Sequence, residues 1–544
     1  MTWTWDVVGG PISPDEKHRR RETIDSYANI AHVSALTVAA FAGAVMLFLR
    51  FRPATTTPPV YAQVPTSPVA KARRLRLRRF NARHLLSRIR WWLDDDLPGG
   101  AGHRHEWIFG LVWALWLLTL CVRDTGSDFL HLTKRFGAVA VSQLPTLYLL
   151  SLKAFGSSHE MLNRLHAVLG RLVGLLLLLH VVCYNYFFFV AGIWPKRLFD
   201  LVVVYGVVAF LALLALGLSA MASVRRASYR VFIRVHLVVA LLVPLLVFFH
   251  APSVRLYLVE AFLALIVDIS VRKLRSVNVP STLVFRPDAN LVAVEATVPP
   301  RISRALSDSP AAYVYVSLPQ LSGAFDFLHN PFTVASVDDN RGTLTLVARV
   351  RNGPVTMTLA RLASSSSSST RKHPLIIDGP YGSIALRLIA RCPSRVLLIA
   401  GGIGATFILP THRFLREHLP EARLRLIWTV RDEADTAWAT EADLVPEDAQ
   451  LFVTGSRTRP NDAIEMRPLS SSSTTTNSSS PPNHHRGRPD LDAIVDAVFR
   501  QGYEDPVAVL VCGPAGLAAD VRRRVRPWAM QGRDVWWHSE SFGC

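Results

Sequence analysis

Residues 162–183 read LNRLHAVLGRLVGLLLLLHVVC, an apolar run that carries two histidines, His166 and His180, fourteen residues apart. A second apolar run, YRVFIRVHLVVALLVPLLVFFH (229–250), carries His236 and His250 at the same spacing. Fourteen helical residues turn through about 1400°, which is roughly 40° short of four turns. Both histidines of a run are therefore predicted on nearly one helix face, about 21 Å apart along the axis.

Both runs are long enough to cross a bilayer, and one further apolar run, 199–222, lies between them. Because one crossing separates the two helices, they point the same way. His166 is then predicted to face His236 at one depth, and His180 to face His250 at the other. Ionisable side chains inside a membrane are costly and usually functional. Two imidazoles that meet across a helix gap can ligate one heme iron from both sides, so the pattern predicts two hemes in a helical bundle.

The composition of the chain is that of a membrane protein. Of 544 residues, 50% are hydrophobic, and the mean hydropathy is +0.25, more than a soluble chain normally needs. The N-terminal residues before 29 lack the apolar core of a cleavable signal peptide, so 29–49 is expected to be an uncleaved signal anchor. Seven spans are expected: 29–49, 107–122, 131–152, 162–189, 199–222, 231–250 and 254–271.

The distribution of charge predicts how these spans are oriented. The formal net charge of +19 could suggest a nucleic-acid partner, but the densest basic run, KARRLRLRRFNARHLLSRIR (71–90), lies between apolar runs. Basic loops beside membrane spans mark the cytosolic side. We therefore expect no nucleic-acid partner, an N-terminus outside the cell, and a cytosolic location for everything after residue 272. The five cysteines show no metal-ligand spacing and no disulfide framework.

Four regions are expected along the chain. An N-terminal segment, 1–106, holds one span and the basic linker, and a transmembrane heme domain follows at 107–275. Short strands separated by turn residues predict a β-rich domain at 277–388. Buried strands such as RVLLIAGGIGA (395–405) predict an α/β domain at 394–544. Two serine-rich runs, 364–370 and 470–485, are low-complexity loops, the second within an insertion at 468–486.

From about 107 to 544 the sequence resembles the ferric reductase and NADPH oxidase family, and within it the fungal metalloreductase branch. LHAVLGRLVGLLLLLH (165–180) looks like the first heme helix of that family, and HLVVALLVPLLVFFH (236–250) looks like the second. The resemblance implies two b-type hemes held by the four histidines, together with FAD and NADPH. It also implies a flavin-binding β-barrel followed by an α/β nucleotide-binding domain similar to ferredoxin-NADP reductase.

Three segments resemble the flavin site of the family. HNPFTVAS (329–336) is similar to its His-Pro-Phe-Thr segment, although Asn330 stands where a histidine usually precedes the proline. VARVRNGPVTMTL (347–359) is similar to the stretch that holds the flavin pyrophosphate through either Arg349 or Arg351. DGPYG (378–382) resembles the turn that closes the flavin domain. The implied flavin-binding residues are Pro331, Phe332, Thr333, Arg349, Arg351, Gly353, Thr356 and Gly379.

Five segments resemble the nucleotide site: LLIAGGIGATFILP (397–410), IWTVRDEAD (427–435), GRPDL (487–491), VLVCGPAGLAADVR (509–522) and HSESFGC (538–544). A glycine turn that opens a helix directs backbone N–H groups at a phosphate. An arginine at a strand end suits the 2′-phosphate that distinguishes NADPH from NADH. The implied NADPH-binding residues are Gly401, Gly402, Gly404, Thr406, Arg431, Arg488, Gly513 and Pro514, and the implied catalytic residues are Cys512, Glu540 and Phe542. Phe407 replaces a family proline, and Cys544 stands where the fungal branch often has tryptophan.

The resemblance implies a plasma-membrane relay in which NADPH reduces FAD, and electrons cross through the two hemes to an acceptor outside. An Fe(III) chelate or siderophore is the expected acceptor, with Cu(II) as a second one, in support of metal uptake. Two alternatives stay open. One is an NADPH oxidase that makes superoxide from O₂. The other is a non-catalytic heme-binding membrane protein.

Overall fold

We describe a computed structural model of the chain at residues 5–8, 13–51, 85–95, 97, 102–153, 159–319, 330–351, 353–365, 371–382, 384, 388–389, 391–455, 483–501 and 505–540. The chain divides into two compact units, a helical bundle formed by 1–52 and 93–274, and a second unit formed by 53–92 and 275–543. Phe542 lies outside the described residues. Both serine-rich runs also lie outside them, except for residues 364–365 of the first run and 483–485 of the second. So does most of the basic run 71–90.

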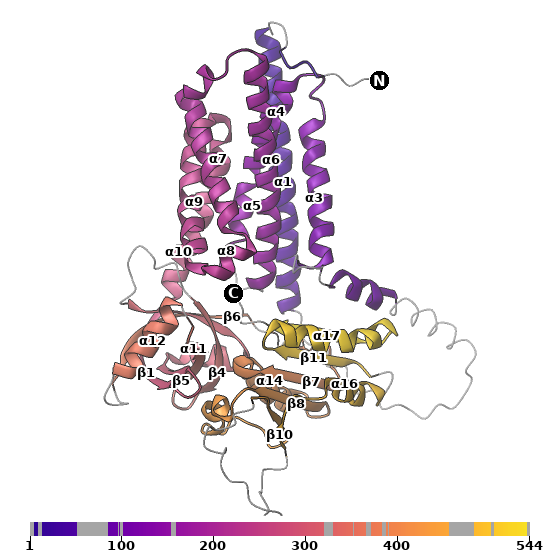
Figure 1. Ribbon diagram of the computed structural model, residues 1–544, viewed down its shortest axis with the longest axis vertical. Coiled ribbons are helices and arrows are strands. Elements are labelled where there is room, and N and C mark those ends of the chain that lie inside the picture. The colour runs from indigo at the N-terminus through magenta and orange to yellow at the C-terminus, as the bar shows by residue number, and fades with distance from the viewer. Residues whose placement is uncertain are drawn as a thin grey trace, which may run out of the picture. The chain divides into compact units, whose positions relative to one another are not determined.

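The bundle consists of helices that run side by side (Figure 1). Its members are α1 (Pro14–Phe51), α3 (Arg104–Val122), α4 (Phe129–Ser142), α5 (Leu144–Leu149), α6 (His159–Val190), α7 (Leu201–Ser219), α8 (Ala222–Ala227), α9 (Tyr229–His250) and α10 (Arg255–Arg275). Among the described residues, five helices are long and apolar enough to cross a membrane, and they lie within α1, α3, α6, α7 and α9. The chain is therefore a multi-pass membrane protein.

Two of the seven expected spans, 131–152 and 254–271, do not form helices that are long and apolar enough to be among these five. The expected span at 131–152 forms two shorter helices, because α4 ends at Ser142 and Pro145 lies in the first turn of α5. A proline fits the first turn of a new helix, where its missing N–H has no partner to lose. The expected span at 254–271 is helical in α10, but it contains Glu260 and Asp268.

The N-terminal helix α1 is built into the bundle. Ala28, Ala31 and Ala35 are almost fully buried and lie on one helix face, so neighbouring helices can approach closely. The side-chain amide of Gln143 donates to the Ala31 carbonyl at 3.0 Å, and His32 Nε2 lies 2.9 Å from Glu260 on α10. These polar contacts tie α1 to the junction between α4 and α5 and to α10, so α1 is an integral helix of the bundle.

The second unit begins with a closed barrel. Its strands are β1 (Val277–Arg286), β2 (Leu291–Thr297), β3 (Tyr313–Ser317), β4 (Asn330–Asp338), β5 (Thr343–Arg349) and β6 (His373–Tyr381), in the order β1-β2-β5-β4-β3-β6. All neighbouring strands are antiparallel. Two helices accompany the barrel, α11 (Pro300–Ser307) and α12 (Pro354–Ser365). Alternate residues such as Val292 and Val294 point inward and fill the barrel core.

A six-stranded parallel sheet follows the barrel. Its strands are β7 (Arg395–Gly401), β8 (Arg423–Val430), β9 (Gln450–Val453), β10 (His484–Arg486), β11 (Val507–Cys512) and β12 (Val535–Glu540), in the order β10-β9-β8-β7-β11-β12. The helices between them are α14 (Ala405–His418), α15 (Ala437–Thr440), α16 (Leu491–Arg500) and α17 (Ala515–Met530). β7 and β11 are buried along their whole length, which explains why they read as unbroken apolar runs. We call this part the α/β subdomain.

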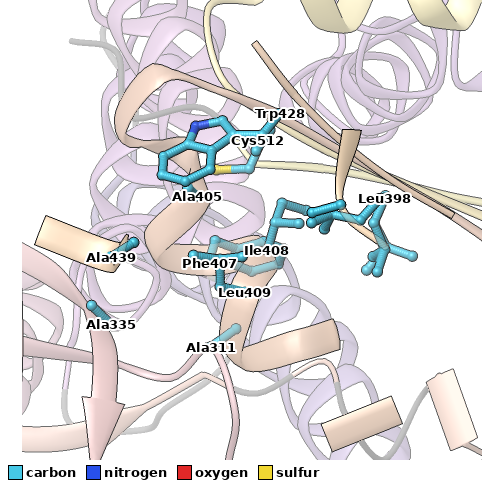
Figure 2. Packing of buried hydrophobic residues seen from close by; sticks show 14 of the residues in the cluster. Ala311, Ala335, Leu398, Ala405, Phe407, Ile408, Leu409, Trp428, Ala439 and Cys512 are labelled. Atoms are coloured by element: carbon cyan, nitrogen blue, oxygen red, sulfur yellow. The ribbon is translucent and has the colours of Figure 1, made fainter. Parts of the chain in front are cut away.

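One hydrophobic core joins the barrel to the α/β subdomain. Figure 2 shows Phe407, Ile408 and Leu409 on α14 beside Ala311 and Ala335 of the barrel. An ion pair between Arg286 of β1 and Glu441 after α15 adds a polar contact. It lowers the pKa of the Glu441 carboxyl, chiefly through its hydrogen bond with Arg286. The barrel and the α/β subdomain are thus held side by side, with their facing edges available for a shared site.

Candidate functional site

The structure brings the four bundle histidines together in the pairs that the sequence predicts. The ring centroids of His166 on α6 and His236 on α9 are 5.9 Å apart, and those of His180 and His250 are 6.4 Å apart. A metal–imidazole bond of about 2 Å on each side separates two facing ring centroids by roughly 6 Å. Each pair therefore has the spacing that one iron needs, while the role of these residues as iron ligands stays a prediction.

Backbone carbonyls orient three of these rings. The Nδ1–H of His166 donates to Leu147 O at 2.9 Å, that of His180 to Thr133 O at 2.8 Å, and that of His250 to Val202 O at 2.7 Å. Because a carbonyl can only accept, the proton of a neutral ring is on Nδ1 and Nε2 keeps its lone pair. This tautomer is the one a metal-ligating histidine adopts. Among the described residues, His236 Nδ1 is buried without a hydrogen-bond partner.

Two glycines make room for one of the pairs. A Cβ at Gly137 on α4 would lie 2.7 Å from His180 Cε1, and a Cβ at Gly206 on α7 would lie 2.6 Å from His250 Cε1. Any larger residue at either position would displace the imidazole. Sequence reasoning missed both glycines, since each lies on a helix adjacent to the one that carries the histidine.

On the barrel, three tyrosines surround the position of the flavin motif. Tyr313 stacks on Tyr381 with ring centroids 6.0 Å apart, and Tyr315 lies 5.3 Å from Tyr381. Tyr313 is in register with Thr333, and Tyr315 with Pro331. Burial raises the pKa of Tyr313 to about 12, with a further contribution from the Glu540 carboxylate. Tyr315 and Tyr381 are buried, so the half-buried Tyr313 is the ring of this cluster on which a flat flavin could stack. Tyr313 was not among the residues predicted from sequence.

The flavin motif residues divide between the core and the surface of the barrel. Pro331 is exposed and Thr333 is half-buried, whereas the Phe332 side chain is part of the barrel core. Gly379 has a φ of 154°, and a Cβ there would lie 2.9 Å from a Val314 methyl. Only glycine fits this close approach of β6 to β3. Because its side chain is in the core, only the backbone of Phe332 is available to contact a ligand.

The two candidate phosphate arginines point to different places. Arg351 is exposed beside the first turn of α12, where the Thr356 hydroxyl donates to the Arg351 carbonyl at 3.1 Å and Gly353 precedes the helix. Arg349 Nη2 instead donates to the buried carboxylate of Asp435 at 2.7 Å. The same Nη2 lies 4.0 Å from the Cβ position of Gly402. Arg351 therefore lies at a helix N-terminus suited to a phosphate, and Arg349 lies at the nucleotide turn.

The glycines of the nucleotide turn allow two strand ends to touch. A Cβ at Gly404 would lie 2.0 Å from Cys512 O, and one at Gly401 would lie 2.8 Å from Pro514 Cδ. A Cβ at Gly513 would in turn lie 3.0 Å from Gly401 Cα. The glycines thus bring the turn after β7 against the turn after β11, which places Cys512 beside the nucleotide turn.

Two buried side chains lock this turn. The Trp428 indole donates to Gly402 O at 2.9 Å, and Figure 2 shows its ring beside Cys512. The Thr406 hydroxyl donates to Ile403 O at 3.0 Å, so it is already used inside the turn. Gly402 has a φ of 55°, a left-handed conformation that favours glycine. Trp428 was not among the residues predicted from sequence, because its role depends on a contact between strands.

The remaining candidates lie at the carboxyl edge of the parallel sheet. Arg431 follows β8 and Arg488 follows β10, and both are exposed. Cys512 and Glu540 end β11 and β12 in register with each other. Open parallel sheets bind their ligands at this edge. Burial raises the pKa of the Cys512 thiol well above its usual value, and the nearby Glu540 carboxylate raises it further.

Glu540 has a partner that the sequence did not reveal. His538 Nε2 lies 3.1 Å from Glu540 Oε1, two residues away on the same strand face. The His538 ring stacks on Phe407 at 5.8 Å and on Trp536 at 5.6 Å. The Glu540 carboxylate raises the pKa of both Tyr313 and Cys512, so it lies near both side chains.

Comparison with known proteins agrees with this arrangement. Three family models match: "Ferric reductase like transmembrane component" at 136–247, "FAD-binding domain" at 276–385 and "Ferric reductase NAD binding domain" at 394–526. The first covers His166, His180 and His236 and ends just before His250. The second covers the barrel, and the third covers most of the α/β subdomain. FAD-binding and NAD-binding domains thus follow the membrane bundle along the chain.

Individual relatives are fungal. A probable metalloreductase AIM14 of Meyerozyma guilliermondii is 27% identical over 75% of this chain and 84% of its own length. The ferric/cupric reductase transmembrane component 2 of Schizosaccharomyces pombe is 24% identical over 71% and 75%. A flavohemoglobin structure from Malassezia yamatoensis covers 85% of this chain and 93% of its own at 15% identity, with a TM-score of only 0.33. With its membrane bundle, flavin barrel and nucleotide subdomain each matched in order, the chain belongs to the ferric reductase family.

Proposed function

We propose that the chain is a transmembrane metalloreductase that transfers electrons from NADPH, by way of FAD and two bis-histidine hemes, to a metal ion. The observation that supports this most strongly is the double histidine pair, His166 with His236 and His180 with His250. The two pairs lie at two depths of one bundle, about 21 Å apart along the helices. Two redox centres at these depths would connect the two faces of a membrane.

The bundle residues would fix both hemes rigidly. Carbonyl-bound Nδ1–H groups hold three of the four imidazoles in one tautomer and one orientation. Gly137 and Gly206 leave the space that the rings of the second pair need. Rigid axial ligands limit the structural change that accompanies electron transfer, and the orienting hydrogen bonds make the ligands more basic.

The second unit would bind FAD and NADPH on facing edges. Thr333 and Tyr313 would contact the flavin ring, and Arg351, Gly353 and Thr356 its pyrophosphate. Gly402 and Arg349 would contact the pyrophosphate of NADPH, and Arg431 and Arg488 its 2′-phosphate. FAD supplies the conversion from a two-electron donor to one-electron acceptors. Cys512 and Glu540 would position the nicotinamide against the flavin, because they end neighbouring strands at the nucleotide turn.

The acceptor is proposed from relatives. Their names describe a probable metalloreductase and a ferric/cupric reductase component. We propose an Fe(III) chelate or siderophore as the substrate, with Cu(II) as a second one, in support of iron and copper uptake. We also propose a plasma-membrane location with the N-terminus outside. The second unit would then be cytosolic, on the side where the basic run 71–90 favours it.

The experiment compares three acceptors in membranes that contain the protein. Fe(III)-citrate, Cu(II) and O₂ are supplied in parallel with NADPH or NADH, and Fe(II), Cu(I) and superoxide are measured. Formation of Fe(II) or Cu(I) with NADPH, lost in His236→Ala, supports the proposal. Superoxide without Fe(II) or Cu(I) would identify an NADPH oxidase. Retained heme without bound FAD and without NADPH-dependent reduction would identify a non-catalytic heme protein.

A further inference from the structure

The basic linker between α1 and α3 contains a short helix, 85–93, with two different faces. At 3.6 residues per turn, Leu85, Leu86, Ile89 and Trp92 fall within an arc of roughly 120°, while Ser87 and Trp91 point the other way. We call 85–93 the linker helix. It lies outside the residues that the three family models match.

One face of the linker helix is docked on the α/β subdomain. Trp91 is only 3% exposed and is part of the core that contains Val521 and Val525 of α17. The guanidinium of Arg522 lies over the Trp91 ring at 4.8 Å. Arg88 Nε donates to Met530 O at 2.7 Å. The helix is thus attached to the subdomain that carries the nucleotide site.

The other face is apolar and open. Leu85, Leu86 and Ile89 are 58%, 66% and 45% exposed. Arg88 and Arg90 flank this stripe on its two sides, and Arg90 is exposed. An apolar stripe bordered by basic residues is the pattern of a helix that lies in a membrane interface.

The chain also holds this helix near the membrane. Only ten residues, 94–103, separate it from α3, which is long and apolar enough to cross a bilayer. Ten residues span at most about 35 Å when fully extended. The helix can therefore reach the membrane surface, where anionic lipids of the cytosolic leaflet attract arginines that lie close to it.

We propose that the linker helix binds an anionic lipid surface through Leu85, Leu86 and Ile89, while Trp91 holds the α/β subdomain on its opposite face. The second unit is then attached to the membrane at two points along the chain, its α/β subdomain through the linker helix and its barrel through α10. The proposal depends on the membrane bundle and not on the identity of the electron acceptor.

The experiment places the photoreactive residue p-benzoylphenylalanine at position 89 or 86 of the full-length protein. The protein is reconstituted in nanodiscs of phosphatidylcholine with or without phosphatidylserine, irradiated and analysed by mass spectrometry. Ser87→p-benzoylphenylalanine, on the docked face, is the matched control. We expect lipid adducts at positions 86 and 89 but not at 87. In anionic nanodiscs, Arg90→Gln should lower the adduct yield roughly fivefold.

Two kinds of result would overturn the proposal. Cross-links from positions 86 and 89 to the same chain or to a second copy would show that protein covers this face. Adduct yields that are equal at 86, 87 and 89, or that are insensitive to Arg90→Gln and to phosphatidylserine, would show that the contact is not an oriented one with anionic lipid. Neither outcome affects the metalloreductase proposal, which is tested separately by measuring the Fe(II) or Cu(I) that the protein forms.

Discussion

Gly206 on α7 leaves the space that the His250 imidazole occupies, because a Cβ at residue 206 would lie 2.6 Å from His250 Cε1. Gly137 on α4 has the same relationship to His180. A glycine inside a helix costs about 0.5–1 kcal/mol relative to alanine. Its presence opposite both histidines of one pair indicates that space for the rings outweighs this cost.

Replacing either glycine should disturb one heme site selectively. We expect Gly206→Ala to displace the His250 ring and to lower the heme content by about one of two equivalents. Gly217→Ala on the same helix is the matched control, because a Cβ there meets nothing within 4 Å. Heme is measured by the pyridine hemochromogen spectrum per protein. Equal heme in both variants would show that Gly206 has no part in the site.

The exposed arginines at the carboxyl edge of the sheet, Arg431 and Arg488, should make the protein prefer NADPH to NADH. Arg431→Ala and Arg488→Ala each remove a charge that would contact the 2′-phosphate, an interaction worth about 1.5–3 kcal/mol. The KM for NADPH should therefore rise roughly tenfold or more, with little change for NADH. Arg416→Ala is the control, since Arg416 lies at the far end of α14 and pairs with Asp448. A parallel rise in both KM values would contradict the assignment.

The Cys512 thiol should resist alkylation. Burial, together with the Glu540 carboxylate, raises its pKa, so the neutral thiol persists where an exposed cysteine ionises. This thiol form favours the folded state below the unfolded pKa of about 8.5, and the contribution is lost as the pH rises above it. We expect iodoacetamide at pH 8 to modify exposed Cys392 but not Cys512, as read by peptide mass spectrometry. Rapid modification of Cys512 at pH 8 would count against its buried position.

His538 should act through Glu540. His538→Ala removes the hydrogen bond at 3.1 Å, whereas His538→Gln can keep one. A neutral hydrogen bond contributes about 1 kcal/mol, so flavin reduction by NADPH should slow roughly fivefold in the alanine variant and less in the glutamine variant. Stopped-flow absorbance of the flavin measures this rate, and the KM for NADPH should not change. Identical rates in the two variants would mean that His538 only fills space.

Local patterns were enough to predict much of the architecture. Helical periodicity placed His166 opposite His236, and buried strands with glycine turns located β7 and β11. Contacts between distant elements were not accessible in the same way. The choice between Arg349 and Arg351 depends on Asp435, which is more than eighty residues away in the sequence.

Other features depended on the close approach of separate elements. Gly137 and Gly206 are recognised only when the neighbouring helix is in place. Trp91 looks like part of a basic linker until α17 covers it. The expected span at 131–152 divides at Gln143, and Pro145 lies in the first turn of the helix that follows.

Heme stoichiometry of the purified full-length protein tests the central claim most directly. Pyridine hemochromogen and iron analyses should give two hemes per chain in the wild type, one in His236→Ala, and two in His105→Ala, which lies outside both pairs. Flavin reduction by NADPH should survive in His236→Ala. One heme in the wild type, or two in His236→Ala, would contradict the assignment of the histidine pairs.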